Sequence, residues 1–82
     1  MHSDSIPVVL VISATDPTGG AGMATDIRVC QRDGVYPLCC VTAVTVQNQH
    51  GVTAVAPSDP DLVRRQLEAA FEAVVPDAVK IG

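Results

Sequence analysis

A glycine-rich segment at positions 16–22, Asp-Pro-Thr-Gly-Gly-Ala-Gly, is the first feature of the sequence that could bind a ligand. Glycines let a backbone approach an anion closely, and the amino end of a following helix favours negative charge, so the segment resembles a phosphate-binding loop. It lacks the lysine of a P-loop, because the chain's single lysine is Lys80. A dinucleotide fingerprint that starts at Gly20 needs glycine at position 25, where Thr25 stands. Ligand binding and tight packing between a helix and a sheet therefore both remain open for this loop.

Other polar residues follow the apolar runs of the sequence directly. In open α/β folds, the carboxyl ends of parallel strands and the amino ends of the following helices meet at one rim, where ligands bind. We expect side chains and loop amides from two strand ends to converge there. The residues expected at this rim are Thr15, Asp16, Gly19, Gly20, Gly22, Gln47 and Asn48.

Asp26 follows one turn into the helix expected after the loop, so its carboxylate either faces the rim or is a solvated surface charge. His50 does not complete a Ser-His-Asp or Cys-His arrangement and is interpreted as a polar loop residue. The three cysteines lack the short paired spacing of zinc sites, so we expect no metal site and interpret them as buried, reduced thiols.

Composition excludes several classes of protein. The chain has 82 residues, 48% of them hydrophobic, which fits one small domain at most and not a disordered segment. Its net charge of −4 argues against nucleic acid as a partner. The longest apolar run, at 8–12, is too short to cross a membrane, and the leader at 1–5 has no Lys or Arg of the kind that begins a signal peptide. We therefore expect a cytoplasmic protein with no membrane contact.

Turn residues divide the chain into strand-like and helix-like pieces, and this alternation predicts the α/β class. The first run, at 8–13, is continuously apolar, which suits a parallel strand covered on both faces. Thr18 is expected to cap the first helix, and the sequence at 58–61 is a clear start for the second. The expected elements are strands at 8–13, 36–46 and 78–81, a less secure edge strand at 52–56, and helices from about residue 21 to Gly34 and from 58–61 to Pro76.

The resulting order, β-α-β-(β)-α-β, calls for a parallel sheet with right-handed crossovers and helices on its faces. A sheet this small would keep hydrophobic edges, so we expect the chain to be an amino-terminal fragment of a larger fold.

Several blocks of sequence together resemble one known family. They are Ser13 to Gly22, Ala24-Thr25-Asp26, Thr42-Ala43, Gln47-Asn48, Gly51-Val52 and Lys80-Ile81-Gly82. In this order and register they resemble hydroxymethylpyrimidine/phosphomethylpyrimidine kinase of thiamine biosynthesis, in the ribokinase-like superfamily.

The resemblance implies the amino-terminal, substrate-side portion (residues 1–82) of a single ribokinase-like domain, a three-layer α/β sandwich with a mainly parallel sheet. It implies ATP and Mg²⁺ as cofactors of the full-length parent, with none bound by this chain alone and the catalytic residues beyond Gly82. By the same resemblance, Gln47 hydrogen-bonds the aminopyrimidine, Asp26 faces the substrate pocket, and Ala14 and Thr45 line it. The segment at 49–56 matches the flap that helps cover the site.

One departure from the family affects substrate choice. The chain has Ala14 where the family usually has glycine, and the added methyl narrows the pocket. A pyridoxal-type kinase of the same superfamily is therefore the first alternative, and a catalytically inert fragment or binding module is the second. The resemblance also allows a homodimer.

Overall fold

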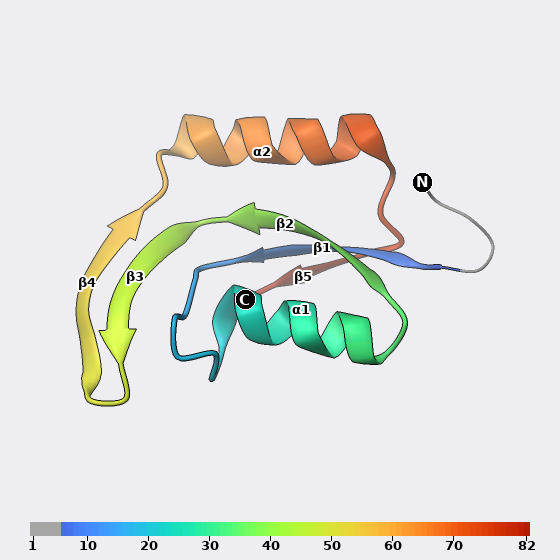
Figure 1. The fold of residues 1–82 in the computed structure, drawn as a ribbon. Coiled ribbons are helices and arrows are strands. Elements are labelled where there is room, and N and C mark those ends of the chain that lie inside the picture. The colour runs from blue at the N-terminus through green and yellow to red at the C-terminus, as the bar shows by residue number, and fades with distance from the viewer. Residues whose placement is uncertain (1–5) are drawn as a thin grey trace.

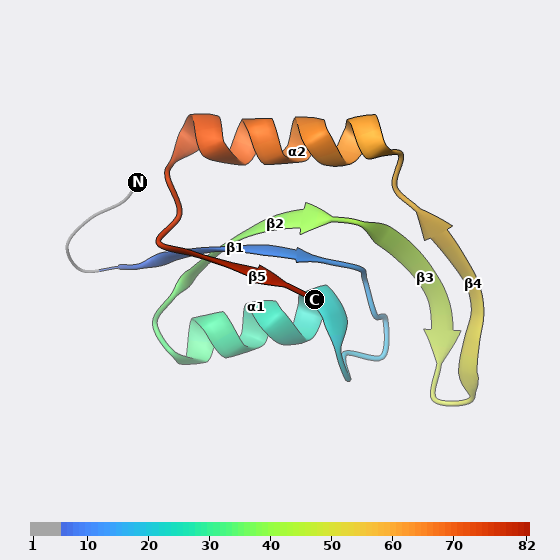
Figure 2. The ribbon, with the colours of Figure 1, turned by 180° about the vertical axis from the view of Figure 1, so that it is seen from behind.

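The computed structural model describes residues 6–82, so the leader at 1–5 lies outside the described residues. Its main sheet contains β1 (Val8–Ser13), β2 (Tyr36–Val41) and β5 (Ala78–Ile81), all parallel, in the order β2-β1-β5. Helix α1 (Gly22–Arg32) covers one face and α2 (Pro60–Ala73) the other (Figures 1 and 2). This confirms the predicted α/β class and the parallel sheet.

The central position of β1 explains its unbroken apolar sequence. Val8, Leu10 and Val11 are at most 1% exposed, because helices lie on both faces of the sheet and strands pair with both edges of β1. A strand buried on both faces has no polar side to alternate with the apolar one. The predicted bounds of β1 and β5 agree with the structure.

The two helices begin differently. The amide of Asp61 donates to the Asp59 carboxylate at 2.8 Å, which confirms the predicted start of α2. The prediction that Thr18 caps α1 is wrong, because the N-cap is Ala21, which makes no side-chain bond. The amide of Met23 donates instead to the carbonyl of Ala14, at 2.9 Å. The preceding loop thus satisfies an amide that a capping side chain would otherwise bind.

The strand predicted at 36–46 is wrong as a single buried element, because the chain leaves the main sheet at Thr42. Strand β2 ends at Val41, and β3 (Ala43–Asn48) pairs antiparallel with β4 (Gly51–Pro57) in a separate hairpin. The predicted edge strand at 52–56 is confirmed as part of β4. A continuous apolar pattern cannot distinguish one long strand from two strands that diverge, because both need the same residue types.

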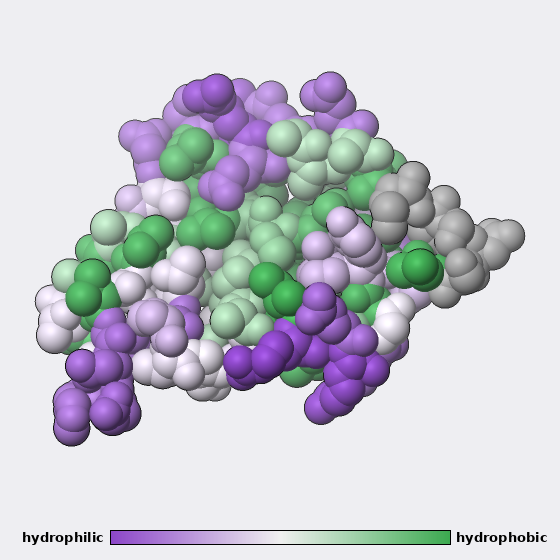
Figure 3. Space-filling model, in the orientation of Figure 1, coloured by the Kyte–Doolittle hydropathy of each residue, from purple (hydrophilic) through white to green (hydrophobic). Residues whose placement is uncertain are grey.

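The hairpin exposes apolar side chains on its surface. Four valines, Val44, Val46, Val52 and Val55, are each 53–58% exposed. Figure 3 shows hydrophobic atoms interspersed with paler ones over the region of the hairpin, and a hydrophilic tip. The hairpin is thus held by backbone pairing and by its anchor points, since it has little core of its own.

Candidate functional site

A cavity of about 370 Å³ lies beyond the carboxyl end of β1, between α1 and β3. It is lined by Thr15, Asp16, Pro17, Met23, Ala24, Ile27, Val44 and Thr45. Apolar side chains form most of its wall, and two hydroxyls and one carboxylate supply the polar groups. Such a lining suits a small organic ring that carries few polar atoms.

Hydrogen bonds join Gln47 to this cavity through two threonines. The Thr45 amide donates to Thr15 Oγ1 at 3.1 Å, and the Thr45 hydroxyl donates to the Thr15 carbonyl at 2.8 Å. Gln47 Nε2 then donates to Thr45 Oγ1 at 2.7 Å. Gln47 itself does not line the cavity, and within residues 6–82 its Oε1 has no hydrogen-bond partner. The Gln47 side-chain amide is therefore held beside the cavity, and its Oε1 can accept a hydrogen bond from a ligand.

The glycine-rich loop is bonded by the chain's own carboxylate. Asp16 accepts hydrogen bonds from the Thr18 hydroxyl at 2.7 Å, the Thr18 amide at 2.9 Å and the Ala21 amide at 3.0 Å. The Gly20 amide donates to Thr18 Oγ1 at 3.2 Å. These bonds use amides that a phosphate would otherwise bind. Of the two interpretations of this loop, the structure favours tight packing and internal order over a phosphate cradle.

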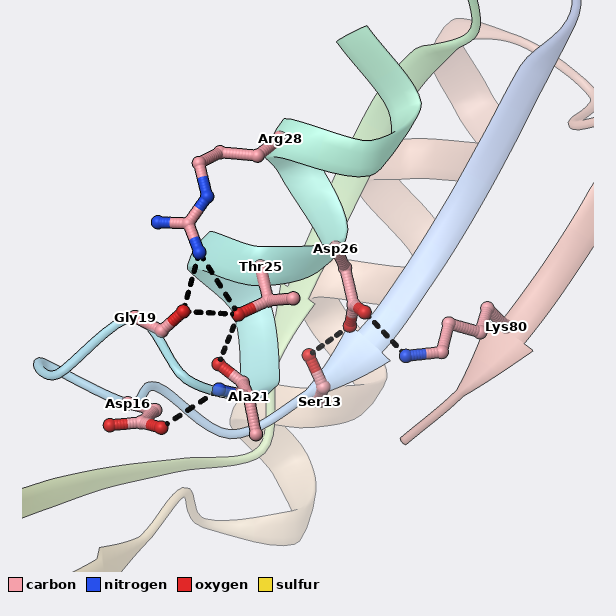
Figure 4. Close-up of polar contacts among 8 residues, drawn as sticks. All are labelled: Ser13, Asp16, Gly19, Ala21, Thr25, Asp26, Arg28 and Lys80. Carbon is pink, nitrogen blue, oxygen red and sulfur yellow. Dashed lines mark hydrogen bonds and ion pairs between the residues drawn. The ribbon is translucent and has the colours of Figure 1, made fainter. Parts of the chain in front are cut away.

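The carbonyl side of the loop is fixed by α1. The Thr25 hydroxyl donates to the Gly19 carbonyl at 2.6 Å, and the Arg28 guanidinium donates to the same carbonyl (Figure 4). Gly22, with a φ of +66°, lets the first turn of α1 lie directly against the backbone of Ala14. In the loop that follows β1, the amides are thus bonded by Asp16 and the Gly19 carbonyl is bonded by side chains of α1, at the edge of the cavity.

The hydrogen bonds of Asp16 predict that the order of this loop depends on pH. The Thr18 hydroxyl, followed by the Thr18 amide, holds the pKa of the Asp16 carboxyl below its ordinary value of 3.8. A lowered pKa stabilises the folded loop fully above pH 3.8, and the stabilisation is lost as pH falls through the folded-state pKa. We expect the Thr18 and Ala21 amide resonances to titrate together in that acidic range.

The measurement is an NMR titration of the chain. In Asp16→Asn, the titration of both amides should disappear, because the side chain no longer ionises. Asp61→Asn, which removes an exposed carboxylate on α2, is the control and should leave the titration unchanged. Thr18 and Ala21 amides that titrate as before in Asp16→Asn would contradict the assignment.

Asp26 lies on the sheet side of α1, where its buried carboxylate forms an ion pair with a partly exposed lysine. The Asp26 side chain is 10% exposed; it accepts from the Ser13 hydroxyl at 3.4 Å and pairs with the Lys80 ammonium. Figure 4 shows the carboxylate pointing toward these two residues. The alternative of a solvated surface charge is therefore wrong, because α1 turns this residue toward β1 and β5.

The predicted site residues thus fall into two groups. Asp16 and Thr45 line the cavity and Gln47 adjoins it, while Ala14, Gly19, Gly20, Gly22 and Asp26 are not part of its lining. No hydrogen bond or ion pair among residues 6–82 links Gln47 to Asp26. Their roles toward a substrate stay predictions. Sequence reasoning did not identify Lys80 as the partner of Asp26, although a single lysine on a strand is an unusual enough feature to have suggested a buried counter-ion.

The remaining reactive residues do not form a site in the part of the chain that the structure describes. All three cysteines are free, and only Cys40 is buried, whereas Cys30 is half-buried and Cys39 is exposed. The prediction of buried thiols is therefore wrong for Cys39, whose side chain lies on the opposite face of β2 from that of Cys40. Burial raises the pKa of the Cys40 thiol, which disfavours the reactive thiolate. Among residues 6–82, no group of three or more His, Cys, Asp or Glu side chains could hold a metal ion, and no helix could span a membrane.

Two solved kinase structures superpose on this fold. The phosphomethylpyrimidine kinase of Clostridium difficile 630 matches 93% of the chain at 39% identity, with a TM-score of 0.88, and the chain covers 33% of it. The Staphylococcus aureus pyridoxal kinase, solved with AMP-PCP and pyridoxal, matches 94% of the chain at 32% identity, with a TM-score of 0.83, and the chain covers 29% of it. The sheet and its helices therefore define the amino-terminal part of a ribokinase-like α/β kinase.

Sequence comparison identifies the family within this class. The family model for phosphomethylpyrimidine kinase matches residues 16–82, and the chain belongs to this family. A thiamine biosynthesis multifunctional protein from Corynebacterium glutamicum is 43% identical over 82 residues, which is 100% of this chain and 11% of that protein. The chain spans about 10–29% of the length of the curated relatives it matches.

Proposed function

We propose that this chain supplies the alcohol-binding side of a kinase for 4-amino-5-hydroxymethyl-2-methylpyrimidine and its monophosphate. In the proposed reaction the γ-phosphoryl group of ATP passes to the hydroxymethyl oxygen, which gives up its proton, and ADP leaves; a second ATP then phosphorylates the phosphate group of the monophosphate in the same way. The observation that carries the proposal is the Thr15–Thr45–Gln47 series of hydrogen bonds beside the cavity, in a chain of this family. The substrate-binding residues in this proposal are Gln47, Asp26, Ala14 and Thr45, with the loop of Asp16, Gly19, Gly20 and Gly22 nearby.

The chemistry of Gln47 suits an aminopyrimidine. An exocyclic amine next to a ring nitrogen offers a donor beside an acceptor, and a primary amide answers both. Gln47 Oε1 accepts from the amine, and its second Nε2 hydrogen donates to the ring nitrogen, while the first stays on Thr45. The apolar wall of the cavity, including Met23 and Ile27, packs against the ring.

ATP and Mg²⁺ belong to the proposed reaction, but the described residues do not fit them. Residues 6–82 hold no cluster of metal ligands, and the loop amides at Thr18 and Ala21 are bonded to Asp16. In the proposed enzyme, nucleotide and metal are held by protein segments that correspond to the parts of the longer relatives not matched by this chain. The chain by itself is accordingly proposed to give no turnover, and the protein is proposed to be cytoplasmic and to form a homodimer.

The first test is binding of hydroxymethylpyrimidine to the chain by calorimetry. We expect weak binding that falls about tenfold in Gln47→Leu, the effect of losing one or two hydrogen bonds to a buried polar ligand. Gln31→Leu, the same change on an exposed residue near the end of α1, should bind as the parent does. Equal binding by both variants would remove Gln47 from the site.

The second test measures phosphoryl transfer. A chimera in which this chain replaces the matching part of the C. difficile enzyme should phosphorylate hydroxymethylpyrimidine, and Gln47→Leu in the chimera should raise KM. The unmodified C. difficile enzyme is the control for the assay. A folded chimera that binds nucleotide but phosphorylates no hydroxymethylpyrimidine would contradict the proposed function.

The second candidate is a pyridoxal-type kinase, favoured by the likeness to the S. aureus enzyme and by Ala14. The discriminating measurement is the ratio of kcat/KM for pyridoxal and hydroxymethylpyrimidine in the same chimera. Ala14→Gly should shift this ratio if the methyl group contributes to the choice of ring. The third candidate, an inert fragment or binding module, predicts that the chimera has no activity toward either alcohol.

A further inference from the structure

A side chain hydrogen-bonds to the outer edge of β2 at Val41, the last residue of this strand. Among residues 6–82, no strand pairs with the outer edge of β2, so the N–H and C=O of Val41 that point away from β1 have no strand beside them there. Gln66 of α2 supplies both partners: its Oε1 accepts from the Val41 amide at 2.8 Å, and its Nε2 donates to the Val41 carbonyl at 3.0 Å. One primary amide thus takes the place of a neighbouring strand.

A second group of bonds meets the same point from the start of α2. Ser58 Oγ donates to the Val41 carbonyl at 2.9 Å, and the Ser58 amide donates to the Thr42 carbonyl at 2.8 Å. On the inner side, the Thr42 amide donates to the Ser13 carbonyl at 3.0 Å. The junction of Val41 and Thr42 is therefore bonded to β1 on one side and to the segment around α2 on the other.

This junction is where the hairpin leaves the main sheet. β3 begins at Ala43, directly after it, and β4 ends at Pro57, directly before Ser58. Both ends of the hairpin therefore adjoin the hydrogen bonds that Ser58 makes to the carbonyls of Val41 and Thr42. Figure 1 shows the hairpin curving from this point toward the α1 side of the sheet, whereas α2 covers the opposite face.

We propose that Gln66 is a positioning residue that sets the direction in which the hairpin leaves the sheet. The hairpin carries Thr45 and Gln47, so the amide of Gln66 holds them at the cavity without touching it. Where a bound pyrimidine is concerned, the inference rests on the proposed function. The hairpin geometry itself does not depend on that function.

The chemistry of a glutamine is specific at this position. A glutamate at position 66 has the same shape and can accept from the Val41 amide, but it cannot donate to the Val41 carbonyl. Its second carboxylate oxygen would face the Val41 carbonyl oxygen, and the two would repel each other. A methionine keeps the length and makes neither bond. Ser58→Ala removes one donor and leaves the Gln66 amide in place, so its effect should be the smallest of the three.

The test is amide hydrogen exchange of the full chain, followed by NMR, in Gln66→Glu and Gln66→Met. We expect the bonded amides of β3 and β4 to exchange about tenfold faster, while those of β1 and α1 keep their protection. Gln31→Glu makes the same chemical change on an exposed residue of α1 and should leave all rates unchanged. Ser58→Ala should raise the hairpin rates by a smaller factor, and it provides the readout if both Gln66 variants fail to fold.

Each result decides the inference. Faster exchange confined to the hairpin supports a positioning role. Unchanged hairpin rates overturn it, and so does an equal increase in β1 and α1, because that would make Gln66 a general stabiliser. Hydroxymethylpyrimidine binding to the parent chain tests the proposed function separately. Absence of binding would contradict hydroxymethylpyrimidine as the substrate, while the exchange pattern would still decide whether Gln66 positions the hairpin.

Discussion

Gly22→Ala is expected to lower the free energy of unfolding by about 4 kcal/mol, the largest effect of any single change considered. Gly22 has a φ of +66°, and a Cβ placed there would lie 2.6 Å from the carbonyl oxygen of Ala14. That oxygen accepts the hydrogen bond from Met23 at the first turn of α1, so relieving the clash also breaks the bond. The loss would be measured by urea denaturation followed by circular dichroism.

Gly34→Ala is the matched control for this change. Gly34 has a φ of +73°, close to that of Gly22, but an added Cβ would have no atom within 4 Å. We expect a loss of about 1 kcal/mol there, which is the cost of the left-handed backbone alone. The difference between the two variants measures the contact with Ala14. Equal losses would show that backbone conformation, and not close packing of the loop against α1, requires glycine at position 22.

Lys80→Met is expected to lower the free energy of unfolding by about 2 kcal/mol, because it leaves the Asp26 carboxylate buried with only the Ser13 hydroxyl as a partner. A fully buried pair would lose more on such a change, but the Lys80 side chain is 53% exposed and water screens part of the interaction. The loss would again be measured by urea denaturation.

Arg64→Met is the matched control, since it also replaces a cation with methionine. Arg64 pairs with Asp61 and Glu68 on the surface of α2, where its side chain is 62% exposed, and we expect a change of about 0.5 kcal/mol or less. In the double variant Asp26→Asn with Lys80→Met, the loss should be smaller than in Lys80→Met alone, because no buried charge is left without a partner. Additive losses would mean that Asp26 and Lys80 do not act as a pair.

The hairpin marks the limit of what local sequence patterns predict for this fold. The run at 36–46 is rich in apolar and β-branched residues on both sides of Thr42, and β-branched Thr42 itself does not indicate a break in the strand. The break follows from partners far along the chain, because Gln66 and Ser58 bond the junction of Val41 and Thr42. A pattern read over a few residues contains no information on such partners.

The candidate site shows the same division. Residue type and spacing predicted that Gln47 and Thr45 belong near the end of a strand, and the family resemblance named them as substrate contacts. The sequence left ligand binding and internal packing both open for the glycine-rich loop, because both use the same residue types. The structure shows that the Thr18 and Ala21 amides donate to Asp16 within the loop. Thr18 was given a capping role by its sequence position, whereas its hydroxyl bonds Asp16 within the loop.

By itself, the sequence determined which residues form helices and most of the strands, the parallel α/β class, and membership of the family. The helices, strands and fold class depend on short-range properties, namely side-chain periodicity, helix-start residues and glycine or proline at turns. Family membership depends on blocks of residues shared with the family, which can be recognised in the sequence alone. Tertiary structure alone decided that Asp26 pairs with Lys80, 54 positions away, and that Gln66 holds the end of β2, 25 positions away. Such contacts form between groups brought together only when the sheet and helices pack, so their partners are chosen by the geometry of the whole fold and not by any local stretch of chain.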